Sequence, residues 1–414
     1  MTAQATETAR AETPAVGWAI RQPAYDARVE RVRRELEARG LDALVLFHPI
    51  RMAYVSGFFH LSTERPMAIV VPLAGGLGTL IPHLEQEHIA KAPSITRVKV
   101  YPEYPSGGTK HPMAHLKDLL AEMGLDAPAR RLGYDSDGYL DINGYDGPLL
   151  SAVTEATTVR ARDLVDKLRA VKSEAELAFI RMSCVWGNLA HRLMHDKLAL
   201  GRTELEISAE ASTEAGRTMV AALGPGYQPL TAGWGNPVTV IFHAGASTAQ
   251  PHGLANAVGL RRGDVLVTGA TADVGGYNSE LERTMLLGEP TPEFERHFAL
   301  MLQLQQAGFD ALRPGRTLAE AETDVANAYT ALGVADLQRH HTGHAIGLEG
   351  HEAPFIDKGD ETIIQKNMVF TVEPGLYVPG LAGFRHSDTV VVRADGVERL
   401  TYYPRDLGSL VVPV

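Results

Sequence analysis

The stretch that decides the fold is GDVLVTGATADVGGYNSELERT, residues 263–284. Residues 265–268 form an apolar, β-rich run, the Asp-Val-Gly-Gly sequence at 273–276 has turn chemistry, and residues 277–284 run back. This pattern predicts a β-hairpin. Because side chains alternate between the two faces of a strand, Glu280 and Glu282 should point the same way. Two carboxylates on one face of a central strand are unfavourable unless they are paired, bound to a ligand or used in chemistry.

The residues before the hairpin alternate between helical and strand-like patterns. After a tail at residues 1–20 that we expect to be disordered, they predict an α/β domain at residues 21–160. The expected helices are 25–39 and 115–123, and the expected strands are 43–47, 52–58, 66–72, 80–82 and 96–101.

A second domain is predicted at residues 161–414. Ser173, Thr203 and Thr317 each precede a glutamate by three positions, which is the capping-box pattern that begins helices. Another helix is expected at 293–312, and Asp395 followed by Gly396 predicts a second hairpin. We therefore expect a curved sheet backed by helices.

Composition and charge narrow the classes of function. The 414-residue chain is 45% hydrophobic and has a formal net charge of −11, without a long basic block, which argues against nucleic acid as its partner. The single cysteine, Cys184, excludes a disulfide within the chain and reads as a small core residue. No apolar run reaches the roughly 18 residues of a membrane span, and the first residues lack a signal-peptide pattern. We expect a cytoplasmic protein without a membrane partner.

Four further stretches carry residues suited to chemistry. They are STAQPHG at 247–253, HHTGHAIGLEGHEAP at 340–354, TVEPG at 371–375 and GFRHSDTV at 383–390. Ordinary structural interpretations remain open for three of their residues: a loop histidine for His252, a turn residue for Glu373 and a surface ion pair for Arg385. The histidine-rich stretch is more typical of a site, because glycines beside imidazoles suit ligand binding better than a packed core.

Together these stretches resemble the pita-bread family of creatinase, prolidase, aminopeptidase P and methionine aminopeptidase. The resemblance runs from about residue 25 to the end, and its markers include LRAVKSEAE at 168–176, PH at 251–252, GHAIGLEGHEAP at 343–354, TVEPG and GFRHSDT. It implies an α/β (α+β) protein with an N-terminal creatinase-type α/β domain and a C-terminal pita-bread domain. It also implies a homodimer.

The resemblance places a metal-ligand set on this chain. The family's peptidases hold two metal ions on two aspartates, a histidine and two glutamates, and the matching positions here are Gly269, Glu280, His344, Glu373 and Ser387. Glycine offers no ligand, a serine hydroxyl is a poor ligand for a hard divalent ion, and a two-metal site needs bridging carboxylates. We therefore predict no metal and no cofactor. Glu280, His344 and Glu373 leave a one-metal site as the alternative.

The resemblance extends to creatinase, the family's metal-free member. Glu282 in LERT and Glu373 match the glutamates that bind its substrate, and His252 matches its general acid/base. Arg65 in ERPMAIVV matches an N-domain arginine that holds the substrate carboxylate. His351 stands where creatinase has a second arginine and matches the prolidases instead.

These correspondences predict a site for a small zwitterionic or peptide-like ligand. A histidine can activate water near neutral pH, crowded carboxylates can hold a cationic nitrogen, and arginines can clamp a carboxylate. The predicted catalytic residues are His252, Glu282 and Glu373, and the predicted substrate-binding residues are Arg65, Glu280, His344, His351 and Arg385.

The predicted activity is metal-independent hydrolysis of a C–N bond in a small zwitterion. The alternatives are a catalytically inactive, prolidase-like binding protein and a one-metal Xaa-Pro dipeptidase.

Overall fold

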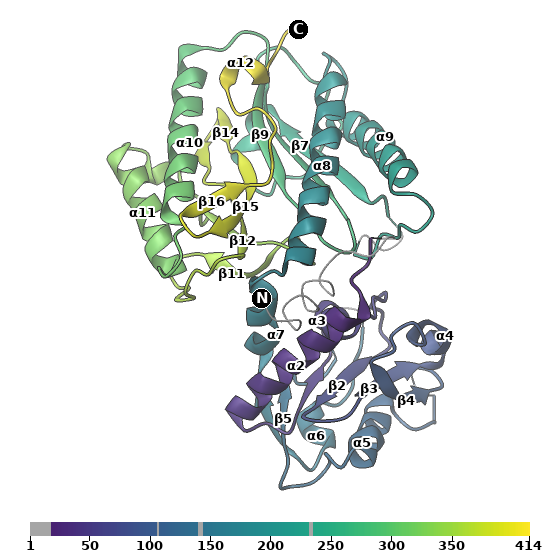
Figure 1. The fold of residues 1–414 in the computed structure, drawn as a ribbon. Coiled ribbons are helices and arrows are strands. Elements are labelled where there is room, and N and C mark those ends of the chain that lie inside the picture. The colour runs from purple at the N-terminus through teal and green to yellow at the C-terminus, as the bar shows by residue number, and fades with distance from the viewer. Residues whose placement is uncertain (1–17, 106, 140–143, 232–234) are drawn as a thin grey trace, which may run out of the picture. The chain divides into compact units, whose positions relative to one another are not determined.

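The computed structural model describes residues 18–105, 107–139, 144–231 and 235–414, and it consists of two compact units (Figure 1). The N-terminal unit spans Ile20–Arg169, and the second unit contains Ala170–Val414 together with Trp18 and Ala19. The chain passes between them at the end of α7 (Arg162–Ala170), later than the predicted boundary between residues 160 and 161. The tail predicted at residues 1–20 lies outside the described residues except for its last three.

The N-terminal unit is built on a six-stranded mixed sheet in the order β4-β3-β2-β1-β5-β6. The strands are β1 (Ala43–Leu46), β2 (Ala68–Pro72), β3 (Leu77–Pro82), β4 (Ile95–Tyr101), β5 (Arg131–Tyr134) and β6 (Thr157–Arg160). The helices of this unit are α2 (Gln22–Arg39), α3 (Pro49–Ser56), α4 (Gln86–Ile89), α5 (Pro112–Glu122) and α6 (Leu150–Val153). Helix α5 packs on β3 and β4 over an apolar core that includes Phe47, Val70 and Leu116. The predicted α/β fold is confirmed.

One predicted strand of this unit is wrong. Residues 52–58 were expected to be extended, but they belong largely to α3. Pro49 occupies the first turn of this helix, where its fixed φ favours the helical conformation. Gly57 ends the helix with a φ of 76° and donates its backbone N–H to the Ala53 carbonyl. Pro49 at the start of the helix and Gly57 at its end therefore outweigh the strand preference of the residues between them.

The second unit contains a curved antiparallel sheet whose central path, within the described residues, is β11-β10-β12-β15-β9-β8-β7. Its strands are β7 (Val238–Ala244), β8 (Val265–Ala272), β9 (Leu281–Leu287), β10 (Gly343–Ala345), β11 (Glu352–Ile356), β12 (Val369–Val372) and β15 (Ser387–Arg393). Strand β16 (Gly396–Arg399) pairs with β15, and β17 (Val411–Val412) pairs with β9. Strands β13 (Leu376–Val378) and β14 (Ala382–Phe384) form a separate pair.

Helices back this sheet (Figure 1). They are α8 (Glu174–Asp196), α9 (Glu204–Leu223), α10 (Pro292–Ala311) and α11 (Leu318–Ala331), with the short α12 (Leu407–Leu410) near the end. Ser173, Thr203 and Thr317 form complete capping boxes at the starts of α8, α9 and α11, as predicted. Helix α8 packs on β8, α9 on β7 and α10 on β12. Cys184 on α8 is buried, as expected for a core residue.

The two predicted hairpins are confirmed, and they position the chemistry of the second unit. Strands β8 and β9 pair with Gly269 opposite Glu282, and β9 pairs with β15 so that Ser387 also lies opposite Glu282. Strands β15 and β16 form the hairpin predicted at Asp395 and Gly396. Residues from β8, β9 and β15 are thereby brought to one point of the sheet.

A buried ion pair fixes β9 beside β15. Arg283 donates to Asp388 Oδ1 at 2.8 Å, and both side chains are fully buried. The same guanidinium donates to the carbonyls of Ser387, Tyr403 and Pro404. Removing one partner from such a buried pair typically costs about 3–5 kcal/mol, because the other charge is left uncompensated. This pair therefore holds the central strands in register.

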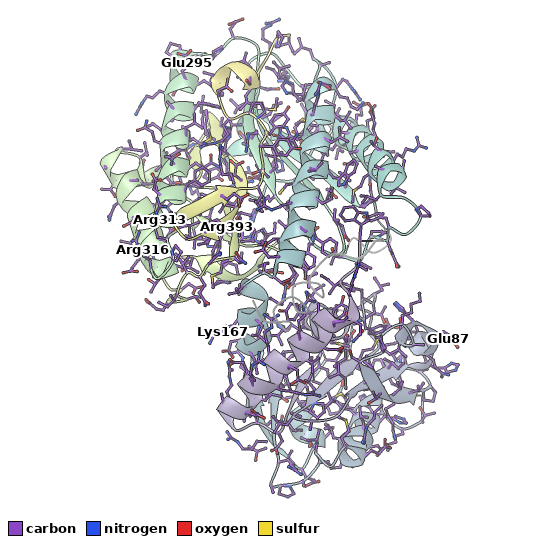
Figure 2. The ribbon with its side chains drawn as sticks, in the orientation of Figure 1. Glu87, Lys167, Glu295, Arg313, Arg316 and Arg393 are labelled. Atoms are coloured by element: carbon purple, nitrogen blue, oxygen red, sulfur yellow. The ribbon has the colours of Figure 1, made fainter. Side chains whose placement is uncertain are left out.

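Charged side chains project outward from both units. Figure 2 labels Glu87 and Lys167 in the N-terminal unit and Glu295, Arg313, Arg316 and Arg393 in the second unit. In the part of the chain that the structure describes, no helix combines the length and the apolar character that a membrane crossing requires.

Candidate active site

Three carboxylates converge at the central strands of the second unit. Glu280 precedes β9, Glu282 lies on β9 and Glu373 directly follows β12. Each offers an oxygen within 4.8 Å of the other two, which confirms that Glu280 and Glu282 point the same way. Glu282 and Glu373 are only 9% and 8% exposed. Such crowding of buried carboxylates requires compensation by positive charge or by protons.

Arg385 supplies one compensating charge. It lies between β14 and β15, and its Nε and Nη2 atoms donate to the two oxygens of Glu282 at 2.5 and 2.6 Å. The Nε atom is also 3.8 Å from Glu373. Burial disfavours the charged guanidinium, but Glu282 keeps the pKa of Arg385 well above its ordinary value. Arg385 is only 9% exposed, so the interpretation as a surface ion pair is wrong.

His344 on β10 supplies the second charge. Its Nδ1 donates to the Ala345 carbonyl at 3.0 Å, which leaves Nε2 3.2 Å from Glu373 and 3.8 Å from Glu280. Burial lowers the pKa of His344, but the two carboxylates outweigh burial and raise this pKa to about 9. Burial raises the pKa of Glu373, but His344 and Arg385 outweigh burial and lower this pKa to about 2.

The negative charge of Glu280 is removed by a bound proton instead of being balanced by a cation of the protein. Burial and the charge of Glu373 raise the pKa of Glu280 to about 8, so the group is largely protonated at pH 7. Ser387 Oγ donates to Glu280 Oε1 at 2.7 Å. Burial also raises the pKa of Glu282, although Arg385 opposes this shift. Arg385 and His344 thus supply two cations to a cluster of three carboxyl groups, of which Glu280 is largely protonated near pH 7.

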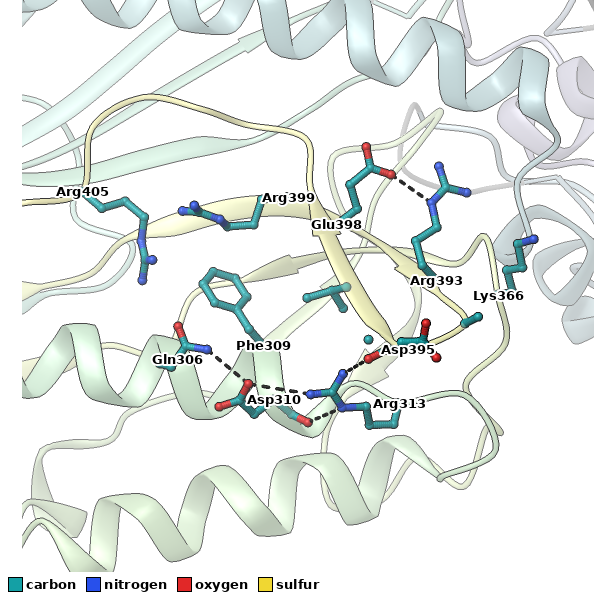
Figure 3. A pocket seen from close by; sticks show the side chains of 13 residues that line it. Gln306, Phe309, Asp310, Arg313, Lys366, Arg393, Asp395, Glu398, Arg399 and Arg405 are labelled. Atoms are coloured by element: carbon teal, nitrogen blue, oxygen red, sulfur yellow. Dashed lines mark hydrogen bonds and ion pairs between the residues drawn. The ribbon is translucent and has the colours of Figure 1, made fainter.

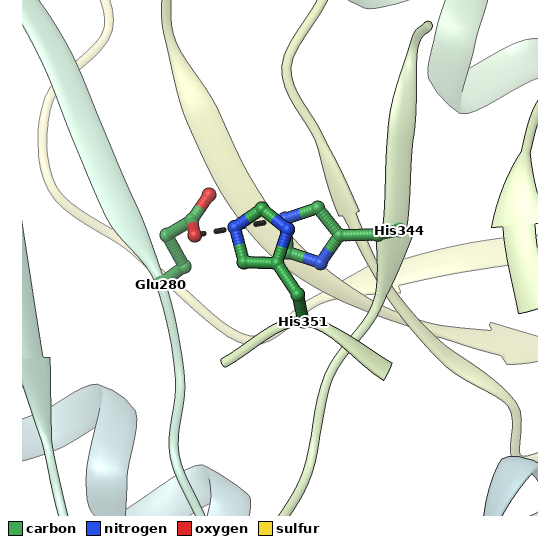
Figure 4. A group of neighbouring side chains, drawn as sticks. All are labelled: Glu280, His344 and His351. Carbon is green, nitrogen blue, oxygen red and sulfur yellow. Dashed lines mark ion pairs between the residues drawn. The ribbon is translucent and has the colours of Figure 1, made fainter. Parts of the chain in front are cut away.

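Two predicted histidines border this cluster from exposed loops. His351 stacks on His344 with their ring centroids 3.7 Å apart. Figure 4 shows His351 in front of His344, with Glu280 beside the two rings. Burial, with added repulsion from His344 and His252, lowers the pKa of His351 to about 4. His252 follows Pro251, whose carbonyl accepts from Arg385 Nη1 at 3.3 Å. The structure thus brings both histidine loops to the carboxylate cluster.

Arg65 belongs to the N-terminal unit. Its Nε atom is 2.6 Å from Glu103, and it also pairs with Glu64. Its role toward a substrate carboxylate stays a prediction.

Sequence reasoning missed the contribution of Tyr377 and His340. The Tyr377 hydroxyl on β13 accepts from Arg385 Nη1 at 3.2 Å and hydrogen-bonds His340 Nε2 at 2.7 Å. Together with Glu282 and Pro251, this hydroxyl fixes the guanidinium. The histidine-rich stretch contained His340, but no pattern in the sequence indicated that β13 returns toward Arg385.

At two of the positions that the resemblance assigns to the family's metal ligands, the side chains offer no carboxylate. Gly269 has no donor, although a Cβ at this position would make only ordinary contacts with Ile241 at 3.5 Å and Glu282 at 3.7 Å. Ser387 directs its hydroxyl to Glu280.

One metal ion is a different case. Donor atoms of Glu280, Glu282 and Glu373 lie within 4.8 Å of one another, and so do those of Glu280, His344 and His351 (Figure 4); neither group is the predicted set of Glu280, His344 and Glu373. Binding by the group that contains His344 would require neutral His344.

Both units match established family models. Residues 178–394 match metallopeptidase family M24, and residues 28–171 match the creatinase/prolidase N-terminal domain. The chain therefore belongs to the M24 family, with the pita-bread fold of creatinase and prolidase.

Relatives matched by sequence carry the names of peptidases. The probable dipeptidase PepE of Mycobacterium tuberculosis is 29% identical over 412 residues, covering 94% of this chain and 98% of that protein. The Xaa-Pro dipeptidase of Pyrococcus furiosus is 31% identical over 245 residues, covering 59% of this chain and 67% of that protein.

Solved structures share the fold. The crystal structure of dipeptidase PepE from Mycobacterium ulcerans has a TM-score of 0.80 and 26% identity, covering 96% of this chain and all of that one. The N-terminal domain of the FACT complex subunit SPT16 from chickpea has a TM-score of 0.72 and 14% identity, covering 94% of this chain and 99% of that one. The second likeness shows the fold alone, so the activity must be argued from the residues of the site.

The raised pKa values of Glu280 and His344 predict that the protein loses stability on the alkaline side. A group with a raised folded-state pKa stabilises the fold at low pH, and this contribution is lost as the pH rises. The stability that Glu280 contributes is lost between about pH 4.5 and 8. The stability that His344 contributes is lost between about pH 6.5 and 9. We expect Glu280→Gln, which cannot lose a proton, to reduce the fall in denaturant midpoint between about pH 7 and 8.5.

The matched control is Glu361→Gln, which changes an exposed carboxylate. It should keep the wild-type pH dependence. If Glu280→Gln and wild type lose stability in parallel over this window, Glu280 is not protonated in the folded protein at pH 7.

Proposed function

We propose that this chain is a metal-independent hydrolase that cleaves a C–N bond in a small zwitterionic substrate, in the manner of creatinase. The observation that carries the proposal is the charge balance of the site. Arg385 and His344 compensate Glu282 and Glu373, and Glu280 holds a proton. These residues compensate the carboxylates that a pair of metal ions would otherwise bind.

Electrostatics oppose a metal pair at this place. Two unit charges 4 Å apart interact by about 4 kcal/mol at the effective dielectric constant of a protein site, and a divalent ion doubles that figure. The Arg385 guanidinium lies 3.8 Å from Glu373, so a dication bound to Glu373 would be strongly repelled by it. Gly269 and Ser387 provide no carboxylate to offset this repulsion.

The roles of the site residues follow from their contacts. Glu280 and Glu373 face the same space, and the ionised Glu373 suits the cationic nitrogen of a zwitterion. Because Glu282 engages Nε and Nη2 of Arg385, we assign Arg385 to hold Glu282 in place rather than to clamp the substrate. The substrate carboxylate is assigned to Arg65, as the resemblance to creatinase implies.

The chemistry requires a base and an acid. His252 accepts a proton from water, the resulting hydroxide attacks the carbon, and the C–N bond breaks with its electron pair moving to nitrogen. Glu280, with its pKa of about 8, can donate the proton that the leaving nitrogen takes up. This division of roles uses one exposed imidazole and one protonated carboxyl group.

A second candidate function is a one-metal Xaa-Pro dipeptidase. It is favoured by the convergence of Glu280, His344 and His351 and by relatives that are named Xaa-Pro dipeptidases. A third, the inactive binding protein, is an outcome of the experiments below. The homodimer and the cytoplasmic location remain predictions.

Restoring the lost ligands tests the metal-free assignment. In Gly269→Asp/Glu280→Asp/Ser387→Glu, five metal ligands surround the site, and the space at Gly269 admits a side chain. Manganese should then raise the free energy of unfolding, by about 2.7 kcal/mol at a hundredfold excess over its dissociation constant. Without metal, the crowded carboxylates should make this variant less stable than wild type.

Thermal melts with and without manganese measure the effect. Gly269→Asn/Glu280→Asn/Ser387→Gln has nearly the same shape without the carboxylates and serves as the control. Wild type and this control should show little shift. A shift in wild type as large as in the restored variant would contradict the metal-free site.

His252 should be essential for turnover. We expect His252→Ala to lower the rate by about a hundredfold or more on any amidine, guanidine or amide substrate that wild type hydrolyses, because the water loses its base. Leu254→Ala, which changes an exposed residue of the same loop, should retain activity. A fully active His252→Ala enzyme would refute the assignment of the base. An absence of turnover by wild type throughout such a screen would favour the binding-protein alternative.

A further inference from the structure

A second concave site lies in the C-terminal unit, away from the carboxylate cluster. It is a cleft of about 710 Å³ between the end of α10, the β15–β16 hairpin and the chain before α12 (Figure 3). None of its 13 lining residues is a candidate active-site residue. Its charged side chains are Arg313, Lys366, Arg393, Arg399 and Arg405 on the basic side and Asp310, Asp395 and Glu398 on the acidic side.

The acidic side chains do not neutralise this cleft. Arg393 pairs with Glu398 at 2.9 Å, and Arg313 lies 3.8 Å from Asp310. In contrast, among the described residues Arg399 and Lys366 form no ion pair, and both are exposed. A net positive cleft stands out in a chain whose formal net charge is −11.

Two arginines converge at one end of the cleft on a buried aromatic ring. The guanidinium carbons of Arg405 and Arg399 lie 5.1 and 5.9 Å from the ring centroid of Phe309, within the range of cation–π contacts. Burial and the repulsion of Arg399 lower the pKa of Arg405, although Asp388 opposes them. Arg405 is further positioned by Gln305, which accepts from its Nε at 3.0 Å. Arg405 also pairs with the buried Asp388, whose Oδ2 lies 3.7 Å from its Nε. The ring, Gln305 and Asp388 thus hold Arg405 in place, whereas Arg399 carries a positive charge beside the ring that no ion pair among the described residues compensates.

We propose that this cleft binds a small polyanion that carries phosphate groups, with Arg399 and Arg405 as its main ligands. Planar guanidinium groups match the geometry of phosphate oxygens through paired hydrogen bonds, and Lys366 adds a point charge at the far end. The volume of the cleft suits a small ligand. Because the cleft shares no residue with the active site, the proposal does not depend on which reaction the protein catalyses.

Calorimetric titration of the full chain with sodium diphosphate tests the proposal. We expect one binding event per chain at about 0.15 M salt, where weak contacts between exposed charges are largely screened. Arg399→Gln should weaken binding about tenfold or more, since it removes a charged donor pair from the ligand. Arg217→Gln removes an exposed arginine of α9 and changes the net charge equally, so it should leave the affinity unchanged.

Four results would overturn the proposal. The first is the absence of diphosphate binding by wild type. The second is equal weakening by Arg399→Gln and Arg217→Gln, which would mean unspecific attraction. The third is binding that survives Arg399→Gln but is lost in Arg385→Gln, which would place the anion in the active site. Citrate that binds as tightly as diphosphate would refute the assignment to phosphate groups. Arg399 is exposed, so its replacement leaves the folded state testable even if Arg405→Gln fails to fold.

Discussion

Three carboxylates meet at the central strands of the second unit, and their repulsion is the constraint that the other residues of the site must satisfy. Arg385 reduces this repulsion most directly, because its positively charged guanidinium donates to both oxygens of Glu282. This pair is itself fixed by the hydroxyl of Tyr377 and the carbonyl of Pro251, so the loop that carries His252 is tied to the same guanidinium. The position of the proposed base therefore depends on the ion pair between Arg385 and Glu282.

The sheet can keep this site because its register does not depend on metal ligands. Arg283 and Asp388 form a fully buried pair that joins β9 to β15, with further hydrogen bonds to backbone carbonyls. Gly269 and Ser387 lie opposite Glu282 on the two neighbouring strands. The side chains at these two positions can therefore differ without changing the register of the strands, because the buried pair of Arg283 and Asp388 holds β9 beside β15.

The fold was largely predictable because its signals are local. The capping boxes at Ser173, Thr203 and Thr317 and the two hairpins depend on residues within a few positions of one another. The helix α3 was misread because β-forming residues hid the effect of Pro49 and Gly57, which act at its two ends.

The site was predictable only in part. Strand alternation predicted that Glu280 and Glu282 point to the same face, and the family resemblance implied that the other residues belong to the same site. The bidentate contact between Arg385 and Glu282 could not be predicted, because it depends on the register of strands about a hundred positions apart in the sequence. The contact of Tyr377 with Arg385 has the same origin, since it follows from the separate pairing of β13 with β14.

The central claim is that protein cations, and not metal ions, balance the carboxylates of this site. Elemental analysis of the protein, purified without chelators and with metal-free buffers, tests it most directly. The account predicts manganese, cobalt and zinc contents far below one ion per chain. About two ions per chain would contradict it outright. About one ion would instead favour a mononuclear site, at Glu280 with either His344 and His351 or Glu282 and Glu373.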